Sequence, residues 1–560
     1  MNRLYYGDCL TVMQSMNLAS VDLIYLDPPF NSQRDYNAIY KDETGRPLPD
    51  QIDAFCDQWT LDEETERAIR QQPVLMRENG IDDAVAEFWR LWMQALRNTN
   101  PRLLAYLTYM VQRLLPMRGL LKPTGSLYLH CDPTAGHYIK VLLDAIFGHK
   151  NFRNEITWKR TNAHPLSIRK FDAITDSIFF YTNSSKYTFN GDFMPMTEAQ
   201  VDELYKVRDQ RGRYSSTDLT GGKKGGPEAY KPLKGVLPST GRAWAPPTLD
   251  KLPNWAQQEL GDEYTKLNQL EKCYALDDIG LIHWTKRGRP RFKRYLEGPA
   301  EQLVPSLWTD ITPALGDERL GYDTQKPLAL LERIIRASSN PGDVVMDPFC
   351  GCATTLEAAQ KLGREWIGID IAIHAIKRVA KVRLEDRLSL VEGQDFTIDG
   401  VPKTWEGASD LWQRDKYHFQ KWAVEQVDGF VTTKRTADGG IDGRIYFDHP
   451  DHKDFQSMAL EVKGGKNVGI AVLRELRGVI QTDQAQMAGL IVLNDPSDRQ
   501  MASYRRFMAE SGDLDVYGVL YPRFQILTVE QILKGERFKM PSPRGRGAGQ
   551  VQMPIQQLGD

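Results

Sequence analysis

The sequence predicts an α/β protein with more than one domain. Over residues 1–150, strand-like apolar runs alternate with helix-like segments, and the same alternation returns at 325–395. A third α/β stretch occupies 413–535. This alternation favours sheets with helices packed on their faces. Because 560 residues exceed one ordinary hydrophobic core, two or three domains are expected.

The composition is that of an ordinary globular protein, with 41% hydrophobic and 26% charged residues. The net charge of −3 excludes a uniformly basic nucleic-acid binder but allows local basic patches. The amino terminus, MNRLYYGDCL, has no apolar signal core, and no stretch approaches the roughly 18 apolar residues of a membrane span. A cytoplasmic location without membrane contact is therefore expected. The six cysteines form no CxxC pair and no Cys/His cluster, which disfavours structural zinc and disulfides.

Along the chain, the first strand candidates are LYYGDCL, VDLIYLD and GSLYLHC, and the helix candidates are 83–118 and HYIKVLLDAIF. From 151 to about 320 the pattern loosens into Gly-, Lys- and aromatic-rich stretches. A polar, Trp-bearing connection at 396–412 is predicted to be a linker. The tail 536–560, rich in Pro, Gly and Arg, is predicted to be disordered.

The motif YLDPPFN ends one apolar strand in an acid, two prolines and an aromatic ring. Pro28 and Pro29 supply no N–H and fix φ, so the chain leaves the sheet on a stiff path. The loop brings together the Asp27 carboxylate, the Pro28 carbonyl and the Phe30 ring, a set suited to a flat group that bears an amino function. The alternative is a strand followed by a plain proline-rich turn.

A second loop, in DVVMDPFCGCATTLEAAQKLGREWIGIDI, follows a β-branched strand that ends at Asp347. Gly351 lies in the turn, and Thr354 and Thr355 open a helix. The next strand ends at Asp370, 23 positions after Asp347, close to the spacing at which an acid meets ribose hydroxyls. Because the loop is neither GxGxxG nor a phosphate-binding loop, a cofactor with a nucleoside but no phosphate fits better, and S-adenosylmethionine is such a cofactor.

Four motifs, GDC, DPPF, TQKP and DPFCGCATT, occur in that order. Together they resemble the amino-group DNA methyltransferases of the permuted β class, similar to the modification subunits of type III restriction systems. The resemblance covers about 1–395. It implies a Rossmann-like, S-adenosylmethionine-dependent methyltransferase domain that acts on double-stranded DNA, with a target-recognition region inserted at 151–320. It also admits a homodimer and further restriction or defence subunits, which no sequence feature decides.

The same resemblance implies which residues hold the cofactor. Asp8 of GDC would contact the adenine, and Asp370 would hold the ribose. Ala353 stands where the family usually has a second glycine, and tighter packing rather than lost binding is expected there. The residues that would surround the methionine end are Gln325, Lys326, Pro327, Asp347, Phe349, Gly351, Thr354 and Thr355.

In this class the DPPF loop is catalytic. The Asp27 carboxylate and the Pro28 carbonyl would accept hydrogen bonds from an exocyclic base amine and direct its lone pair toward the sulfonium methyl. Pro29 keeps the loop stiff, and Phe30 would stack on the base after it flips out of the duplex. DPPF resembles the adenine-N6 subset more than the cytosine-N4 subset, which stays as the alternative. The step needs no metal.

Within 151–320 the clearest feature is HWTKRGRPRFKRY, which interleaves aromatics with six basic residues and has no acid. Such a composition suits phosphate contacts with occasional stacking on DNA. The alternative is a solvated basic loop. The segment 205–247 is a candidate for wrapping DNA or for a flexible insertion. The six basic residues are Lys286, Arg287, Arg289, Arg291, Lys293 and Arg294.

The carboxyl-terminal stretch TADGGIDGRIYFDHPDHKDFQSMALEVKGG carries a different chemistry. Residues 441–447 and 457–463 are predicted to form adjacent strands. Because positions i and i+2 share a face, Glu461 and Lys463 point the same way, and Asp442 on the neighbouring strand can meet them. Two carboxylates suit Mg²⁺, and the lysine can orient water or stabilise charge on phosphorus.

This set resembles the D…ExK core of Mrr-like restriction endonucleases. In that group a glutamate of the preceding helix often joins the site, and Glu425 matches it, so the implied metal ligands are Asp442, Glu461 and Glu425. The alternative is an inactive DNA-binding relic.

The leading hypothesis is therefore a base-amino DNA methyltransferase fused to a magnesium-dependent endonuclease, in restriction-modification or phage defence. The alternatives are a methyltransferase whose carboxyl domain only binds DNA, and a non-enzymatic DNA sensor.

Overall fold

The computed structural model describes residues 2–29, 36–38, 52–55, 59–162, 171–222, 225–318, 325–372, 376, 380, 381, 383–432, 441–449, 452, 455–466, 468–483 and 485–541. These form two compact units, one of 1–190 with 306–560 and the other of 191–305. Among the described helices, none is both long and apolar enough to cross a membrane.

A nine-stranded sheet organises the amino-terminal two thirds of the larger unit. Neighbouring strands run parallel except at β7, which is antiparallel to both β5 and β6. The carboxyl ends of the parallel strands therefore share one edge. The order is β16 (Leu307–Trp308), β6 (Phe152–Lys159), β7 (Thr175–Thr182), β5 (Leu121–Cys131), β2 (Val21–Leu26), β17 (Val344–Asp347), β18 (Glu365–Asp370), β1 (Asn2–Tyr6) and β19 (Phe396–Asp399).

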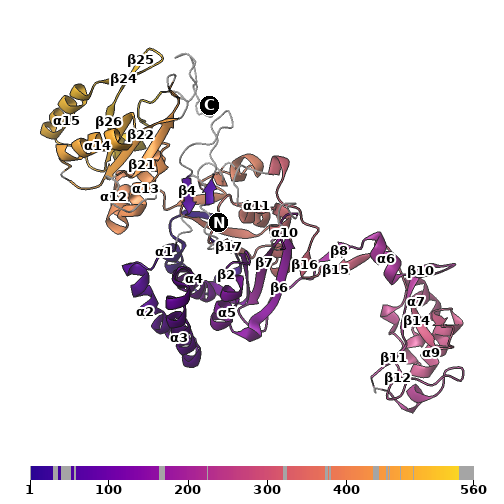
Figure 1. The fold of residues 1–560 in the computed structure, drawn as a ribbon. Helices are drawn as coiled ribbons and strands as arrows, with labels where there is room; N and C mark the ends of the chain where they lie inside the picture. Colours follow the sequence, from indigo (N-terminus) through magenta and orange to yellow (C-terminus); the bar gives the residue numbers. More distant parts are fainter. Residues whose placement is uncertain are drawn as a thin grey trace. The chain divides into compact units, whose positions relative to one another are not determined.

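Helices cover both faces of this sheet. Leu127 and Leu129 of β5 join the core built with α2, α3, α4 and α5, which gather on one side in Figure 1. Tyr128 points to the other face, because successive strand residues alternate, and its hydroxyl lies 2.7 Å from Ser338 Oγ of α10. The helices are α1 (Cys9–Gln14), α2 (Glu63–Glu78), α3 (Asp83–Thr99), α4 (Pro101–Leu120), α5 (Gly136–Phe147), α10 (Leu328–Ser338) and α11 (Thr354–Lys361). A short pair, β3 (Tyr36–Ala38) and β4 (Ile52–Phe55), lies outside the main sheet.

The expected target-recognition region, 151–320, differs from the unit that separates in the structure, 191–305. Its first part supplies β6 and β7 to the main sheet. Residues 178–181 form an apolar run buried on both faces of β7, a pattern typical of a central strand that the loose surrounding sequence concealed.

The unit 191–305 has its own small core under a four-stranded antiparallel sheet. The strand order is β13 (Ile282–Trp284), β14 (Pro290–Tyr295), β10 (Gly212–Asp218) and β9 (Val207–Asp209). The shorter strands are β8 (Phe193–Pro195), β11 (Thr220–Gly221), β12 (Ala243–Trp244) and β15 (Glu301–Leu303), and the helices are α6 (Glu198–Leu204), α7 (Asn254–Leu260), α8 (Glu263–Lys266) and α9 (Gln269–Asp278).

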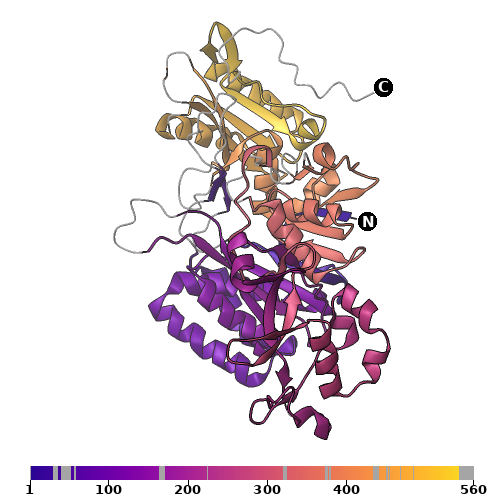
Figure 2. The ribbon, with the colours of Figure 1, turned by 90° about the vertical axis from the view of Figure 1, so that its right-hand side faces the viewer.

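The carboxyl-terminal region forms a separate five-stranded sheet with helices beside it, drawn in orange and yellow in Figure 2. β20 and β21 are antiparallel to their neighbours, whereas β22, β23 and β26 are parallel. The strands are β20 (Phe430–Val431), β21 (Gly443–Phe447), β22 (Gln456–Lys463), β23 (Met487–Val492) and β26 (Phe524–Thr528), with the hairpin β24 (Asp513–Val516) and β25 (Val519–Pro522). The helices are α12 (Trp405–Arg414), α13 (Lys416–Gln426), α14 (Ile470–Asp483), α15 (Asp498–Ser511) and α16 (Val529–Leu533).

The stretch 396–412, expected to be a linker, instead holds β19 and most of α12. The connection between them turns at Gly400, whose φ is +86°. A Cβ there would lie 2.2 Å from the carbonyl oxygen of Tyr6, so only glycine fits this turn. Of the expected tail, 536–541 is described and the rest lies outside the described residues.

Candidate active sites

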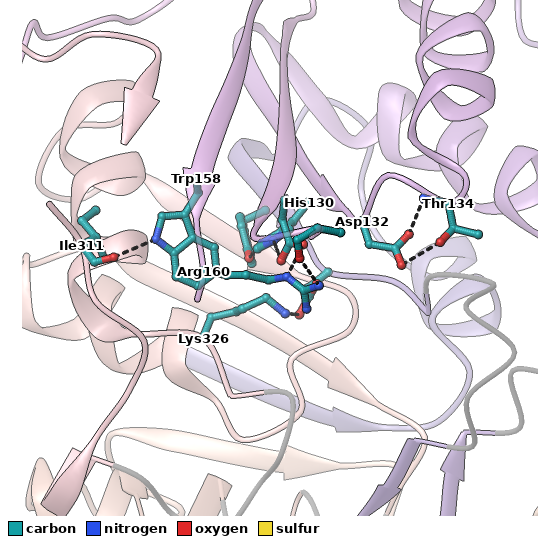
Figure 3. Close-up of polar contacts among 11 residues, drawn as sticks. His130, Asp132, Thr134, Trp158, Arg160, Ile311 and Lys326 are labelled. Carbon is teal, nitrogen blue, oxygen red and sulfur yellow. Dashed lines mark hydrogen bonds and ion pairs between the residues drawn. The ribbon is translucent and has the colours of Figure 1, made fainter. Parts of the chain in front are cut away.

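The DPPF loop follows β2 at the carboxyl edge of the main sheet. Asp27 is half-buried, and its Oδ2 accepts a hydrogen bond from the ammonium of Lys326, which Figure 3 labels. The other oxygen, Oδ1, is buried and has no hydrogen-bond partner among the described residues. A buried, unsatisfied acceptor is costly, so this oxygen is suited to a donor that arrives with a ligand. Phe30 lies outside the described residues.

Lys326 had been assigned to the methionine end of the cofactor. In the structure its ammonium binds the Asp27 carboxylate, and the role of Lys326 at the cofactor stays a prediction. The rest of the TQKP segment is held by Glu318, whose carbonyl accepts from Gln325 Nε2 at 2.7 Å and whose Oε1 accepts from the Leu328 N–H at 2.6 Å. Glu318 thus caps α10, where Pro327 at the N-cap has no side chain to do so.

The second loop lies beside the first, after β17. Asp347 Oδ1 accepts from the Phe349 N–H at 3.0 Å, and Oδ2 accepts from the Thr355 hydroxyl. Burial raises the pKa of Asp347 to about 7. A carboxylate with so costly a charge is suited to a cationic ligand, such as an amino group, that would stabilise its ionised form. Thr354, next to Thr355, is also buried where α11 begins.

Asp370 closes the same loop from the end of β18. Its Oδ2 accepts from the Gly351 N–H and its Oδ1 from the Ala372 N–H, both at 2.8 Å. Burial also raises the pKa of Asp370. Ala353 adopts a left-handed conformation, with φ +61°, and is fully buried. The departure from the family pattern therefore costs backbone strain, beyond the tighter packing that was expected.

Both carboxylate oxygens of Asp8 have partners within the protein, which the sequence did not indicate. It is the N-cap of α1, where Oδ1 accepts from the Leu10 N–H at 2.7 Å, and its Oδ2 pairs with Arg113 Nη2 at 2.5 Å. Arg113 is itself buried and lies 3.4 Å from the centre of the Tyr109 ring. Sequence reasoning missed Arg113 because it lies within an otherwise apolar helix, where only the buried charge would have been a signal.

The basic segment of the unit 191–305 divides into two groups. Arg291 and Lys293 lie on β14 and hold the sheet, through Ser216 and through Asp209 at 2.8 Å. The other four basic residues are exposed, and their contact with DNA stays a prediction. These are Lys286, Arg287, Arg289 and Arg294.

In the carboxyl-terminal sheet, Glu461 lies on β22, and Asp442 comes directly before the neighbouring strand β21, which begins at Gly443 rather than at 441. Asp442 Oδ2 accepts from the Val462 N–H at 2.7 Å, and Glu461 Oε1 pairs with Lys463 Nζ at 2.6 Å. Glu461 Oε2 is buried with no hydrogen-bond partner in the described part of the chain. Burial raises the pKa of Asp442 to about 6 and that of Glu461 to about 7.

No group of three His, Cys, Asp or Glu residues within the described ranges is placed to hold a metal ion. The expected trio of Asp442, Glu461 and Glu425 is thus not gathered into one three-ligand site. Glu425 lies on α13, which packs against β21 and β22. Instead, the charge of Glu475 on α14 contributes to raising the pKa of both Glu461 and Lys463, a residue that sequence reasoning did not name.

Two family models match the chain. The model of DNA methylases matches residues 21–381, more than half of the sequence, and the model of restriction endonucleases matches 409–504. The chain therefore belongs to the DNA methylase family and carries a fused Mrr-like endonuclease domain.

Three relatives illustrate this family. The type II methyltransferase M.EcaI of Enterobacter cloacae is 34% identical over 50% of this chain and 57% of its own length. The StyLTI Mod subunit of a type III restriction-modification enzyme, from Salmonella typhimurium, is 26% identical over 64% and 49%. The DNA adenine methyltransferase YhdJ of Escherichia coli is 57% identical over 19% and 38%. The chain thus spans less than two thirds of each relative.

Proposed function

We propose that this chain transfers a methyl group from S-adenosylmethionine to the exocyclic N6 of adenine in double-stranded DNA. The observation that carries the proposal is the Asp27 carboxylate, which has one oxygen held by Lys326 and the other buried with no hydrogen-bond partner among the residues that the structure describes. The cofactor supplies an electrophilic methyl group beside it. The residues suited to hold that cofactor line the edge next to Asp27. They are Asp8, Asp347, Phe349, Gly351, Thr354, Thr355 and Asp370.

In the proposed reaction, Asp27 and Pro28 activate the amino group of the base. An exocyclic amine is a poor nucleophile because its lone pair is delocalised into the ring. Asp27 Oδ1 and the Pro28 carbonyl would each accept one amine hydrogen, which localises the lone pair toward the methyl group and fixes the angle of attack. The name of the adenine methyltransferase among the relatives supports adenine. Cytosine N4 is the alternative.

The test is expression of the wild type and of Asp27→Ala in a host that lacks DNA methylation, followed by mass spectrometry of the DNA nucleosides. N6-methyladenine is expected only with the wild type. The matched control, Asp83→Ala, removes an exposed carboxylate whose ion pair is on the surface and should methylate like the wild type. N4-methylcytosine would overturn the choice of base, and equal methylation by Asp27→Ala would overturn the mechanism.

We further propose that the carboxyl-terminal domain cleaves DNA with Mg²⁺. Glu461 Oε2, which is buried with no hydrogen-bond partner in the described ranges, and the neighbouring Asp442 would supply the one or two carboxylates that Mg²⁺ usually takes, and Lys463 would stabilise charge on the phosphate. Nicking or linearisation of plasmid DNA that depends on Mg²⁺ would test this. Plasmid left intact under all metal and methylation states would favour the DNA-binding relic.

A homodimer and further restriction or defence subunits remain expectations of the resemblance. Binding of S-adenosylmethionine by the purified chain, measured by calorimetry, separates the methyltransferase proposal from the DNA sensor, for which no binding is expected.

A further inference from the structure

A buried polar chain runs along the same edge of the main sheet, behind the DPPF loop. The Tyr25 hydroxyl lies 2.9 Å from His130 Nδ1, and His130 Nε2 lies 3.1 Å from Asp176 Oδ2. Asp176 Oδ1 pairs with Arg160 Nε at 3.0 Å. Figure 3 shows His130 and Arg160 close together. Tyr25, the first residue of this polar chain, lies two residues before Asp27 in the sequence.

The protonation states in this chain follow from its surroundings. Burial raises the pKa of Tyr25 well above its usual value, so the hydroxyl stays protonated and donates to His130. Burial alone would raise the pKa of Asp176, but the hydrogen bond from His130 and the charge of Arg160 hold it below its usual value. Asp176 is therefore a carboxylate that accepts at the Nε2 side of the His130 ring, while the Tyr25 hydroxyl donates at the Nδ1 side.

Burying these polar and charged side chains in the core has a desolvation cost. His130 is completely buried and Asp176 nearly so, and the Trp158 ring meets the imidazole edge-on with centroids 5.7 Å apart. Apolar residues of similar volume at such sites are often as stable or more stable. What the polar chain provides is a fixed position for Tyr25, and through the backbone a fixed position for Asp27.

The far end of the chain reaches solvent. Arg160 follows β6, and its side chain remains 40% exposed although Asp176 and the Ala173 carbonyl, 3.3 Å from Nη2, hold it. Its guanidinium thus offers further N–H donors, in a fixed orientation, at the edge where a flipped base has to enter. A planar cation held in this way suits a phosphate group.

We propose that His130 and Asp176 are positioning residues for methyl transfer, and that Arg160, which Asp176 orients, binds a DNA phosphate beside the target base. The proposal rests on the proposed methyltransferase function. Tyr25 fixes the loop that bears Asp27, and Arg160 fixes the DNA against the same scaffold.

Two pairs of variants separate the two roles. Tyr25→Phe removes one hydroxyl from the chain; its control is Tyr128→Phe, since Tyr128 is the register partner of Tyr25 and also has a buried, bonded hydroxyl. Arg160→Ala removes the exposed cation; its control is Arg153→Ala at the other end of β6, where the guanidinium binds Thr182.

The assay is methyl transfer from labelled S-adenosylmethionine into unmethylated genomic DNA, in a buffer with EDTA to silence cleavage. Tyr25→Phe is expected to lower kcat about 10-fold to 100-fold, with KM for DNA unchanged. Arg160→Ala is expected to raise KM for DNA about 10-fold and to reduce the slope of log affinity against log salt by about one, with kcat unchanged. Asp176→Asn, in the middle, should change both constants.

Cofactor affinity, measured by calorimetry, should equal that of the wild type in all these variants, because none of the changed residues is among those proposed to hold the cofactor. Equal kcat for Tyr25→Phe and Tyr128→Phe would overturn the positioning role, and equal salt slopes for Arg160→Ala and Arg153→Ala would overturn the phosphate contact. A wild type that binds the cofactor but methylates no DNA would instead refute the proposed function itself.

Discussion

The two candidate sites lie in different sheets, but each contains a carboxylate with the same hydrogen-bonding environment. Asp27 and Glu461 each have one oxygen paired with a lysine and the other buried without a partner in the described part of the chain. In the methylase site the lysine comes from position 326, far along the chain. In the nuclease site it is two residues away on the same strand. The shared arrangement leaves one carboxylate oxygen in each site without a partner in the described ranges, and under the proposed functions it would bind an amine hydrogen in the first site and a cation in the second.

The largest effect is expected in the nuclease site. Lys463→Ala removes the charge beside Glu461 and the phosphate position, and cleavage should fall about 10²-fold to 10³-fold. Rates of plasmid cleavage in Mg²⁺ measure this. The control is Lys466→Ala, which removes an exposed lysine just after the end of β22 and should cleave normally. Equal rates for both variants would separate Lys463 from the chemistry.

Lys326→Ala tests the same pairing in the methylase site. Because the Asp27 charge loses its partner, methyl transfer should fall about 10-fold to 100-fold while cofactor affinity is unchanged. The control is Lys122→Ala, since Lys122 pairs with Asp22 at the opposite end of β2. A loss of cofactor affinity, measured by calorimetry, would instead return Lys326 to the methionine end of the cofactor.

The nuclease site should also make stability depend on pH. Burial raises the pKa of Asp442 to about 6 and of Glu461 to about 7, so the folded state keeps protons that the unfolded state loses near pH 4. The stabilising contribution of these two protonated carboxyl groups is therefore fully present below about pH 4 and is lost as the pH rises through 6 and 7. This loss lowers the free energy of unfolding by roughly 2–4 kcal/mol without metal. Mg²⁺ should restore it at pH 8.

Urea unfolding at pH 5 and pH 8 measures this slope. Glu461→Gln should flatten it, whereas Glu510→Gln, which changes an exposed residue, should not. A slope that Glu461→Gln leaves unchanged would contradict the assignment.

The smallest effect is expected at Ala353, a residue of the methylase loop that has no equivalent in the nuclease site. Ala353→Gly relieves the left-handed strain, offset by the greater freedom of glycine in the unfolded chain, so a gain of at most about 1 kcal/mol is expected. Ala358→Gly, inside α11, should lose about that amount. Chemical unfolding distinguishes the two, and a loss at Ala353 would show that its packing outweighs its strain.

Sequence reasoning found the features that depend on neighbours in the chain. The strand that ends in Asp27, the loop from Asp347 to Asp370 and the pair of Glu461 with Lys463 are all local patterns, and the structure places them as expected. The α/β class follows from the same patterns.

Features that depend on distant contacts were missed. Lys326 on Asp27 and Arg113 on Asp8 join positions whose proximity no local pattern encodes. His130 looked like an ordinary strand residue, because its partners lie on two other strands. The strands within 151–182 and 396–399 were missed because flanking polar residues hide short strands that gain their stability only from the sheet.

The place of β1 in the sheet has a consequence for biosynthesis. Although β1 precedes the other strands of its sheet in the sequence, it pairs with β18 and β19, so its first partner is translated only at residue 370 and its second at residue 399. The cofactor edge, which joins Asp8 to Asp370, is completed at that time. The nuclease strand β22 is translated afterwards. Because domains generally fold in the order of synthesis, a nascent chain would complete the fold that modifies DNA before it contains the fold that can cut it.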